Sequence, residues 1–209
     1  MLVSTNIMKV RTRERLPATE RRRSILNAAL TILSKEGYAG MTTSRVAGRI
    51  GVSEPILYRH FPSKRAIMRA VLDEVIARMM ASFRELVAGE TDPVAALLRI
   101  CRAYPELASQ YRQEFRIINQ TLAGNNDPAV RAALTRHYDT YRAFLEALIL
   151  KGQQTGALRR DVTATAGAWH MIHSALGFLM VQDIRMNAAS SKDFEAFAIA
   201  TVGGLLNTR

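Results

Sequence analysis

The stretch from Gly51 to Lys64 concentrates side chains that can make directional contacts with a large polar partner. Arg59 has a planar guanidinium that can donate two parallel hydrogen bonds, whereas the carboxylate of Glu54 only accepts them. Further donors and small apolar groups lie beside these two: Pro55, Ile56, Tyr58, His60 and Lys64. Such a mixture suits a polyanion that also presents hydrogen-bonding edges and methyl groups.

Local signals predict that these side chains lie on one short helix over residues 54–60. Gly51 suits a turn in the left-handed region, Ser53 is a good N-cap, and Pro62 ends the helix. Ser63 then caps the next helix. A helix this short is not stable in water by itself, because even roughly 12–15 residues are marginal. It must be held by packing, for which Leu57 and Phe61, four residues apart, share one inward face.

The segment before it predicts a second short helix that begins at Thr42 or Thr43 and ends at Ile50. Two helices joined by a tight turn form a helix-turn-helix, in which the second helix enters the DNA major groove and the first spans the backbone. On the first helix the side chains placed to touch the backbone are Thr42, Thr43, Ser44 and Arg45, with Arg45 also in reach of a base.

Each predicted role on the second helix follows from the donors and acceptors of the bases. Arg59 suits guanine O6 and N7, Glu54 suits a cytosine amino group, and Pro55 and Ile56 suit thymine methyls. Alternatives stay open for three residues. Glu54 can serve only as a negative charge at the helix N-terminus, Tyr58 can pack part of its ring on the first helix, residues 19–36, and His60 can be a solvated surface residue.

The distribution of charge supports binding to a polyanion. The net charge of +11 belongs almost entirely to one end of the chain. Residues 1–70 carry 14 Lys and Arg but 4 Asp and Glu, whereas residues 71–209 carry 15 and 14. Because the excess coincides with the helix-turn-helix pattern, phosphate binding explains it better than solubility does.

Helical periodicity without strand alternation predicts an all-α fold of about nine helices. The expected ranges are 19–36, 42–50, 54–60, 63–88, 92–102, 105–122, 128–154, 161–186 and 193–206. We expect three parts: a flexible basic arm at 1–17, a helix-turn-helix domain at 18–66, and a helical effector-binding and dimerisation domain at 67–209. The role of the arm is open, and Met8 is an alternative start.

The stretch from Ile25 to Leu72 resembles the tetracycline-repressor (TetR) family of bacterial transcriptional regulators. The resemblance rests on Gly37-Tyr38, Met41-Thr-Thr-Ser-Arg-Val-Ala47, Ile50-Gly-Val-Ser53, Tyr58-Arg-His-Phe61, Lys64 and Ile67. It implies an N-terminal DNA-binding domain, with Tyr58, His60 and Lys64 as phosphate contacts, and a variable helical half. The position of Arg59 varies in that family, so no operator sequence is implied.

The resemblance also implies a cavity for a small effector, which we expect to be lipophilic or aromatic. The candidate lining residues are Tyr104, Tyr111, Phe115, Asn119, Tyr138, Tyr141, Trp169, His170 and Met171. Ordinary core packing is the alternative for each. Two apolar stripes predict a four-helix interface in a homodimer, with a monomeric core as the alternative. They are Ala168, Ile172, Ala175 and Leu179, then Ala198, Ile199, Val202, Leu205 and Leu206.

Enzymatic functions find little support in this sequence. His170 and His173 lack the HExxH spacing of a zinc site, and no phosphate loop, GxSxG or CxxC occurs. We therefore expect no metal, no cofactor and no catalytic residue. The uncharged stretch 162–182 contains too many polar groups to span a membrane. The single cysteine, Cys101, fits a reducing cytoplasm and a packing role. The main prediction is a homodimeric repressor released from a palindromic DNA operator by its effector. A helix-turn-helix protein without an effector is the alternative, and a helical enzyme with a basic surface is a third.

Overall fold

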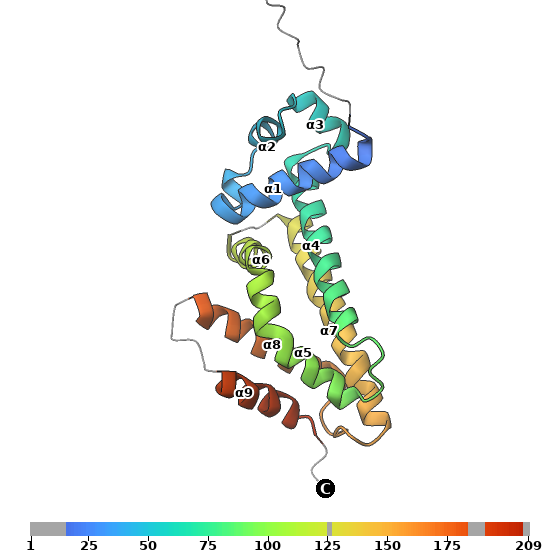
Figure 1. Ribbon diagram of the computed structural model, residues 1–209. Coiled ribbons are helices and arrows are strands. Elements are labelled where there is room, and N and C mark those ends of the chain that lie inside the picture. Colours follow the sequence, from blue (N-terminus) through green and yellow to red (C-terminus); the bar gives the residue numbers. More distant parts are fainter. Residues whose placement is uncertain (1–15, 125–126, 184–190, 207–209) are drawn as a thin grey trace, which may run out of the picture.

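The computed structural model describes residues 16–124, 127–183 and 191–206, and these ranges are almost entirely helical (Figure 1). Their helices are α1 (Ala18–Gly40), α2 (Thr43–Ile50), α3 (Glu54–His60), α4 (Lys64–Leu86), α5 (Pro93–Gln110), α6 (Arg112–Gly124), α7 (Pro128–Gln154), α8 (Ala164–Asp183) and α9 (Ser191–Gly203). The prediction of an all-α fold with nine helices is confirmed for the described residues. Of the predicted arm, residues 1–15 lie outside the described ranges.

Helices α1–α3 form the head of the molecule, at one end of an elongated bundle made of α4–α9 (Figure 1). Leu57 of α3 is fully buried, and Phe61, directly after α3, is 2% exposed. They share a core with Ile25 and Leu33 of α1 and with Val46 of α2. As predicted, packing against α1 and α2 supports a helix too short to be stable alone.

The turn between α2 and α3 is fixed by its backbone. Gly51 has φ 65° and ψ 43°, in the left-handed region that glycine enters without steric cost. Its N–H donates to the carbonyls of Ala47 and Gly48, which closes α2. Two of the expected helix N-caps differ from those in the structure. The Ser53 side chain makes no capping hydrogen bond, and α1 begins after Pro17 rather than with Thr19 as its cap.

In the bundle, α4 runs beside α7, α7 packs on α8, and α5 packs on both α7 and α9 (Figure 1). The hydrophobic side chains form two clusters. One joins the head to the near parts of α4, α6 and α7, and the other fills the far end; Phe115 and Tyr141 pack against both. The expected boundary at residue 66 lies within α4, and Ile67 and Leu72 belong to the core of the head.

Two predicted helix ends differ from the structure, at Pro105 and at Asp161. Helix α5 continues through Pro105, flanked by the buried Tyr104 and Ala108, and the break occurs at Tyr111. Helix α8 begins at Ala164 rather than at Asp161. The predicted end of the first helix at Gly37 is confirmed as a kink within α1, because Gly37 is non-helical at φ 68°.

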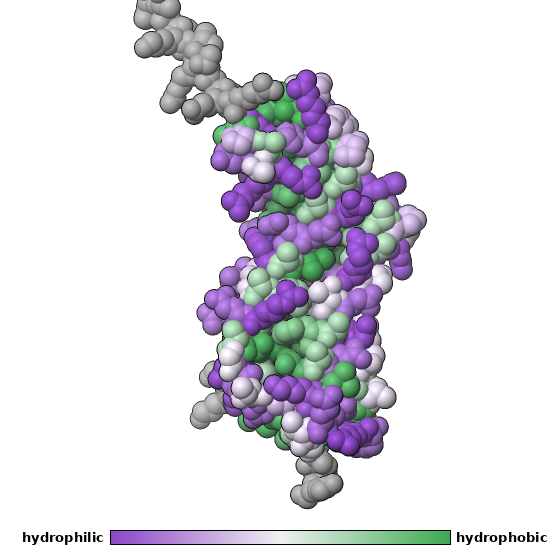
Figure 2. All heavy atoms as spheres, turned by 90° about the vertical axis from the view of Figure 1, so that its right-hand side faces the viewer, coloured by the Kyte–Doolittle hydropathy of each residue, from purple (hydrophilic) through white to green (hydrophobic). Residues whose placement is uncertain are grey.

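The two ends of the molecule also differ at the surface. On the face drawn in Figure 2, hydrophilic side chains predominate at the head, and hydrophobic ones gather in the lower half of the bundle. None of the helices in the described ranges is long and apolar enough to cross a membrane.

Candidate nucleic-acid interface and internal cavity

The predicted DNA-contacting residues lie at the outer end of the head, on α2, α3 and the start of α4. Seven of them are exposed: Thr42, Ser44, Arg45, Pro55, Ile56, Tyr58 and Arg59. The others are partly buried: Thr43, Glu54, His60 and Lys64. Exposure makes these side chains accessible to a partner, while the contact with DNA itself stays a prediction.

A hydrogen-bonded group ties α2 to α3. The hydroxyl of Thr43 donates to Glu54 Oε2 at 2.7 Å and lies 3.3 Å from the hydroxyl of Tyr58. Glu54 therefore has a protein partner, and its carboxylate is held rather than swinging freely in solvent. This bracing role was not predicted, although the short spacing between two facing helices brings Thr43 and Glu54 together.

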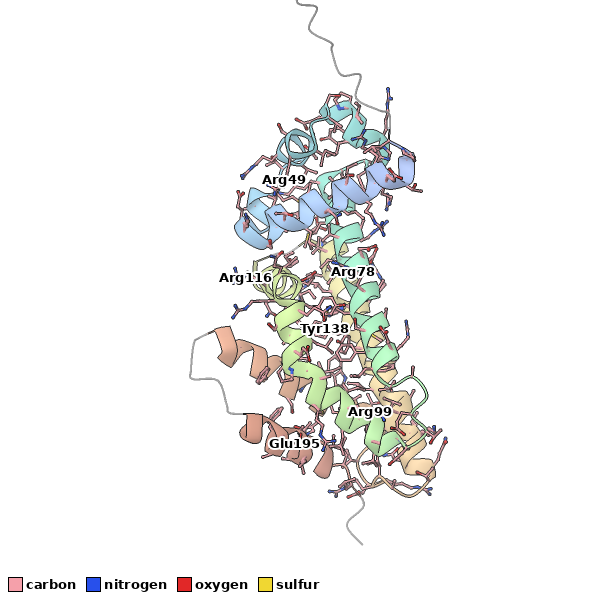
Figure 3. All side chains as sticks on the ribbon, viewed as in Figure 1. Arg49, Arg78, Arg99, Arg116, Tyr138 and Glu195 are labelled. Atoms are coloured by element: carbon pink, nitrogen blue, oxygen red, sulfur yellow. The ribbon has the colours of Figure 1, made fainter. Side chains whose placement is uncertain are left out.

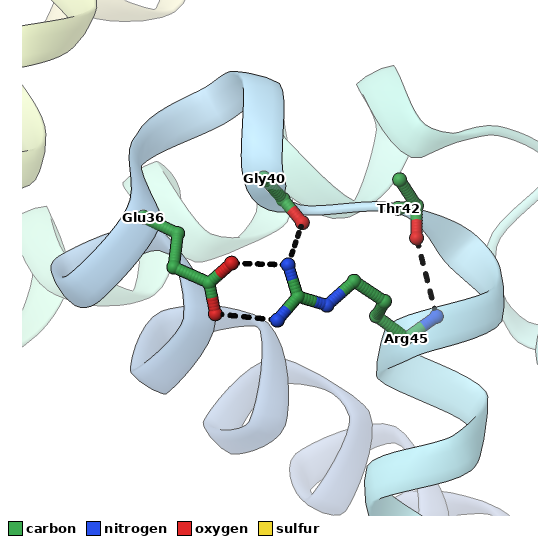
Figure 4. A network of polar contacts seen from close by, with 4 residues as sticks. All are labelled: Glu36, Gly40, Thr42 and Arg45. Carbon is green, nitrogen blue, oxygen red and sulfur yellow. Dashed lines mark hydrogen bonds and ion pairs between the residues drawn. The ribbon is translucent and has the colours of Figure 1, made fainter.

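Arg45 faces back toward α1 rather than outward (Figure 4). Its Nη2 donates to Glu36 Oε1 at 2.6 Å, and its Nη1 donates to Glu36 Oε2 and to the carbonyl of Gly40, the latter at 3.2 Å. The backbone N–H of Arg45 donates to Thr42 Oγ1 at 3.2 Å, which confirms Thr42 as the cap of α2. Three of the five N–H donors of Arg45 are thus used within the head, which holds its guanidinium against α1.

Two basic side chains lie over aromatic rings of the head. Lys64 Nζ is 4.1 Å from the centroid of the Tyr38 ring, and the guanidinium of Arg22 is 4.2 Å from that of Phe61. Partial burial lowers the pKa of the Lys64 ammonium. These cation–π contacts fix the position of the charges without neutralising them. Arg22 was missed because a run of three arginines gives no sign of which one packs inward.

The bundle encloses a cavity with about 770 Å³ of space not filled by atoms, including its opening to solvent. Of the predicted lining residues, the cavity is bordered by Tyr104, Phe115, Asn119, Tyr138, Tyr141 and Met171. Tyr138 lies in the middle of the bundle, whereas Arg99 and Glu195 lie toward its far end and Arg49 lies in the head (Figure 3).

Tyr111, Trp169 and His170 do not line this cavity. The Tyr111 hydroxyl is 2.7 Å from the hydroxyl of Ser82, and the Trp169 ring stacks on His173 with centroids 5.5 Å apart. His170 is exposed. Helical spacing alone does not separate these neighbours from the inward-facing positions.

His137 is the most informative residue that the sequence interpretation missed. It is 4% exposed and lines the cavity one turn before Tyr141 on α7. Burial lowers the pKa of the imidazole to about 4, so it is neutral near pH 7, and burial raises the pKa of the Tyr141 phenol well above its usual value. Within the described ranges no group bonds to His137 Nδ1 or to the Tyr141 hydroxyl. The apolar residues in the turn before His137, Ala133 and Leu134, indicate in the sequence that His137 is buried.

Cys101 also lines the cavity. Burial raises the pKa of its thiol to about 11, which keeps the thiol protonated and unreactive near neutral pH. The described residues contain no cluster of three His, Cys, Asp or Glu side chains placed to hold a metal ion.

The predicted dimer stripes require correction. Five of these side chains lie within the protomer itself, at 5% exposure or less: Ala168, Ile172, Ala198, Val202 and Leu205. Their spacing reflects the protomer's own core, so the prediction that they form a surface is wrong. Ala175 is half-buried, the side chain of Leu179 lies outside the described residues, and Ile199 and Leu206 are exposed at 51% and 37%.

Comparisons with known proteins relate these features to a family. The nucleoid occlusion factor SlmA of Pasteurella multocida is 30% identical over 121 residues, 57% of this chain and 61% of that protein. The HTH-type transcriptional activator FasR of Mycolicibacterium smegmatis is 33% identical over 104 residues, 50% of this chain and 48% of that protein. The chain therefore spans less than two thirds of the length of both relatives.

The fold is shared over almost the whole chain. A crystal structure of a protein from Saccharomonospora viridis in complex with choline matches 91% of this chain and 100% of that one, with a TM-score of 0.76 and 20% identity. Residues 25–71, which include α2 and α3, match the family model of the bacterial regulatory proteins of the tetR family. Residues 25–71 are therefore similar to the N-terminal domain of the tetR family of bacterial regulatory proteins, and the chain as a whole shares the all-α fold of the Saccharomonospora viridis protein.

Proposed function

We propose that this protein is a sequence-specific, DNA-binding transcriptional regulator, acting in the cytoplasm as a homodimeric repressor that a small molecule releases from DNA. The main observation behind the proposal is the outer end of the head, where a hydrogen bond between Thr43 and Glu54 fixes α2 against α3. There the helices α2 and α3 present exposed donors within the part of the chain that holds nearly all of the net positive charge.

In this proposal α3 enters the major groove and α2 lies across the backbone. Arg59 and Ile56 contact bases, and Tyr58, His60 and Lys64 contact phosphates. Lys64 is the first residue of α4, where free backbone N–H groups strengthen an anion site. Thr43 and Glu54 hold the angle between α2 and α3 through their hydrogen bond.

One short reading helix binds weakly, so we infer a homodimer that reads two half-sites. Its surface on the protomer is the exposed apolar part of α8 and α9, where Met180, Phe197 and Ile199 are 64%, 38% and 51% exposed. Light scattering of the wild-type protein should give twice the mass of one chain. The Ile199→Asp variant should give the mass of a single chain. Leu150→Asp, at a 45% exposed position of α7, is the matched control that should remain dimeric.

The cavity supports control by an effector because its helices make polar contacts with α4, the helix that follows α3. Arg78 of α4 donates to Glu114 of α6 at 3.1 Å. Arg65, in the first turn of α4, lies 2.6 Å from Asp127, whose other oxygen caps α7. A molecule that moves α6 or α7 therefore moves the start of α4 and the spacing of the two heads.

The test begins with selection of bound sequences from a random duplex library. We expect a palindrome whose half-sites are separated by about one helical turn, roughly 34–36 Å, or a multiple of it. Retention without any enriched sequence would contradict the specific regulator.

A reporter driven by the selected sequence then distinguishes repression from activation. Compounds that raise the melting temperature are added to the DNA complex. Release from DNA supports the effector-gated repressor. If no compound that binds the protein changes the DNA affinity, the effector-independent alternative is favoured.

A further inference from the structure

The lining of the cavity is unusual in its lack of charge. None of the side chains described around it carries a carboxylate, an ammonium or a guanidinium. The walls are mainly aromatic and aliphatic, and the aromatic rings pack edge to face. Phe83 and Tyr141 have centroids 4.8 Å apart, and Tyr104 and Phe115 have centroids 6.2 Å apart. Such walls favour an apolar body.

Several polar side chains interrupt this apolar lining, including Asn119, Ser174 and Thr201, and two polar atoms on α7 stand out among them. His137 Nδ1 and the Tyr141 hydroxyl are both buried, and neither has a hydrogen-bond partner among the residues that the structure describes. They come from the same face of α7, one turn apart, and their ring centroids are 5.6 Å apart. Since buried polar groups in folded proteins nearly always have partners, two neighbouring exceptions in a cavity wall indicate where a guest bonds.

The chemistry of the two atoms limits the group that satisfies them. A neutral imidazole nitrogen either donates or accepts one hydrogen bond, and a phenol can do both. A hydroxyl also does both, so it matches either tautomer of His137. A carboxylate would enter a buried site without a cationic partner, and an ammonium would enter without an anionic one, which is unfavourable for both.

We propose that the cavity binds an uncharged, largely apolar molecule with one hydroxyl group, which bonds to His137 Nδ1 and to the Tyr141 hydroxyl. The inference rests on the proposed function, because it names the chemical class of the effector. The aromatic rings hold the body of the molecule, and the two polar atoms on α7 select the hydroxyl. Selectivity thus resides on the helix that begins at the Asp127–Arg65 contact with α4.

The test uses four probes, three of which share one apolar body: 4-phenylphenol, biphenyl, biphenyl-4-carboxylate and choline. Binding to the purified full-length protein is measured by calorimetry. We expect 4-phenylphenol to bind about tenfold more tightly than biphenyl, since a gained hydrogen bond has roughly that effect. The carboxylate and choline should bind more weakly than biphenyl.

Three variants locate the effect. Tyr141→Phe and His137→Phe should each reduce the preference for 4-phenylphenol over biphenyl. Tyr111→Phe removes a hydroxyl that bonds to Ser82 outside the cavity, so it should preserve the preference. Tyr141→Phe deletes only one oxygen and keeps the ring, so we expect this variant to fold. It therefore tests the inference even if His137→Phe does not fold.

The outcomes separate this inference from the proposed function. The inference is overturned if choline or the carboxylate binds more tightly than 4-phenylphenol, if Tyr141→Phe keeps the preference, or if none of the probes binds. If 4-phenylphenol binds as expected but does not change DNA affinity, the inference holds and the gating part of the proposed function fails. If biphenyl and 4-phenylphenol bind equally and both release DNA, the inference fails and the proposed function holds.

Discussion

Some polar side chains of the head are paired with one another, whereas two polar atoms beside the cavity have no partner in the described part of the chain. In the head, Thr43 bonds to Glu54 and Arg45 bonds to Glu36. In the bundle, His137 Nδ1 and the Tyr141 hydroxyl are buried and unpaired. Both regions belong to one chain with a continuous helical frame.

The difference reflects two ways of recognising a partner. Internal hydrogen bonds in the head fix α2 and α3 before any partner arrives, which suits a partner of regular shape such as a DNA groove. In the cavity the ligand itself supplies the missing hydrogen bonds, so binding and satisfaction of the wall occur together. The head is preorganised, and the cavity is selective.

The largest expected effect separates the residues that hold α3 from those that it presents. Leu57→Ala removes a fully buried side chain and should cost about 2–5 kcal/mol of unfolding free energy, with loss of DNA binding. Ile56→Ala, at a 37% exposed position, should stay within about 0.5 kcal/mol. Thermal unfolding followed by circular dichroism compares the two. Equal destabilisation would contradict the division of α3 into holding and presenting faces.

The next effect is a pH dependence that arises from the cavity. Because burial lowers the folded-state pKa of His137 to about 4, the unfolded state takes up this proton first, near pH 6.5. Its contribution to stability is complete above about pH 6.5 and falls by about 3 kcal/mol as the pH drops through 4.

Denaturant unfolding between pH 7 and pH 4 should therefore be less steeply pH-dependent in His137→Phe than in the wild type. Identical slopes would show that the imidazole is not buried in its neutral form.

A third prediction concerns the face that the head presents. Arg59→Ala should reduce discrimination at one base position of each half-site, by about 1–3 kcal/mol, while binding to other positions is unchanged. Lys64→Ala is the matched comparison. It should weaken binding to all sequences and lower the slope of log affinity against log salt by about one contact. If Lys64→Ala weakened binding only to particular sequences, or if Arg59→Ala weakened binding to all sequences equally, the assignment of Arg59 to a base and Lys64 to a phosphate would be wrong.

The smallest expected effect tests the unpaired hydroxyl against a paired one. In the ligand-free protein, Tyr141→Phe removes a buried group without a partner and should stabilise the fold by up to about 1 kcal/mol. Tyr111→Phe breaks the bond with Ser82 and should destabilise it by about 1 kcal/mol. Melting temperatures of the two variants should therefore move in opposite directions. A shift of both in the same direction would remove the contrast between a paired and an unpaired buried hydroxyl.

What the sequence predicted well depended on local chemistry. The bounds of α3 follow from Gly51, Pro62 and the spacing of Leu57 and Phe61, all of which act within a few residues. What it missed depended on packing between distant segments. Pro105 is locally a helix breaker, yet the buried side chains on either side of it keep α5 continuous. The apolar stripe with Ala168 and Ile172 has the same periodicity whether it faces a partner or the protomer's own core.

The cavity was expected from the family resemblance, and the aromatic residues of the middle helices supplied only candidate lining residues. Its polar feature was missed, since a lone histidine such as His137 looks in sequence like any satisfied core residue. Only the three-dimensional packing shows that its Nδ1 lacks a partner. The hydrogen bond between Thr43 and Glu54 was missed for the same reason, because it joins residues eleven positions apart on different helices.

The separation of faces on α3 has an evolutionary consequence. Leu57 and Phe61 anchor the helix, whereas Ile56 and Arg59 lie on its exposed side. Substitutions on the exposed side alter what the helix contacts and leave its attachment nearly unchanged, because surface positions contribute little to stability. Descendants of this chain can therefore acquire new binding preferences through single substitutions, without first accumulating compensating changes in the core.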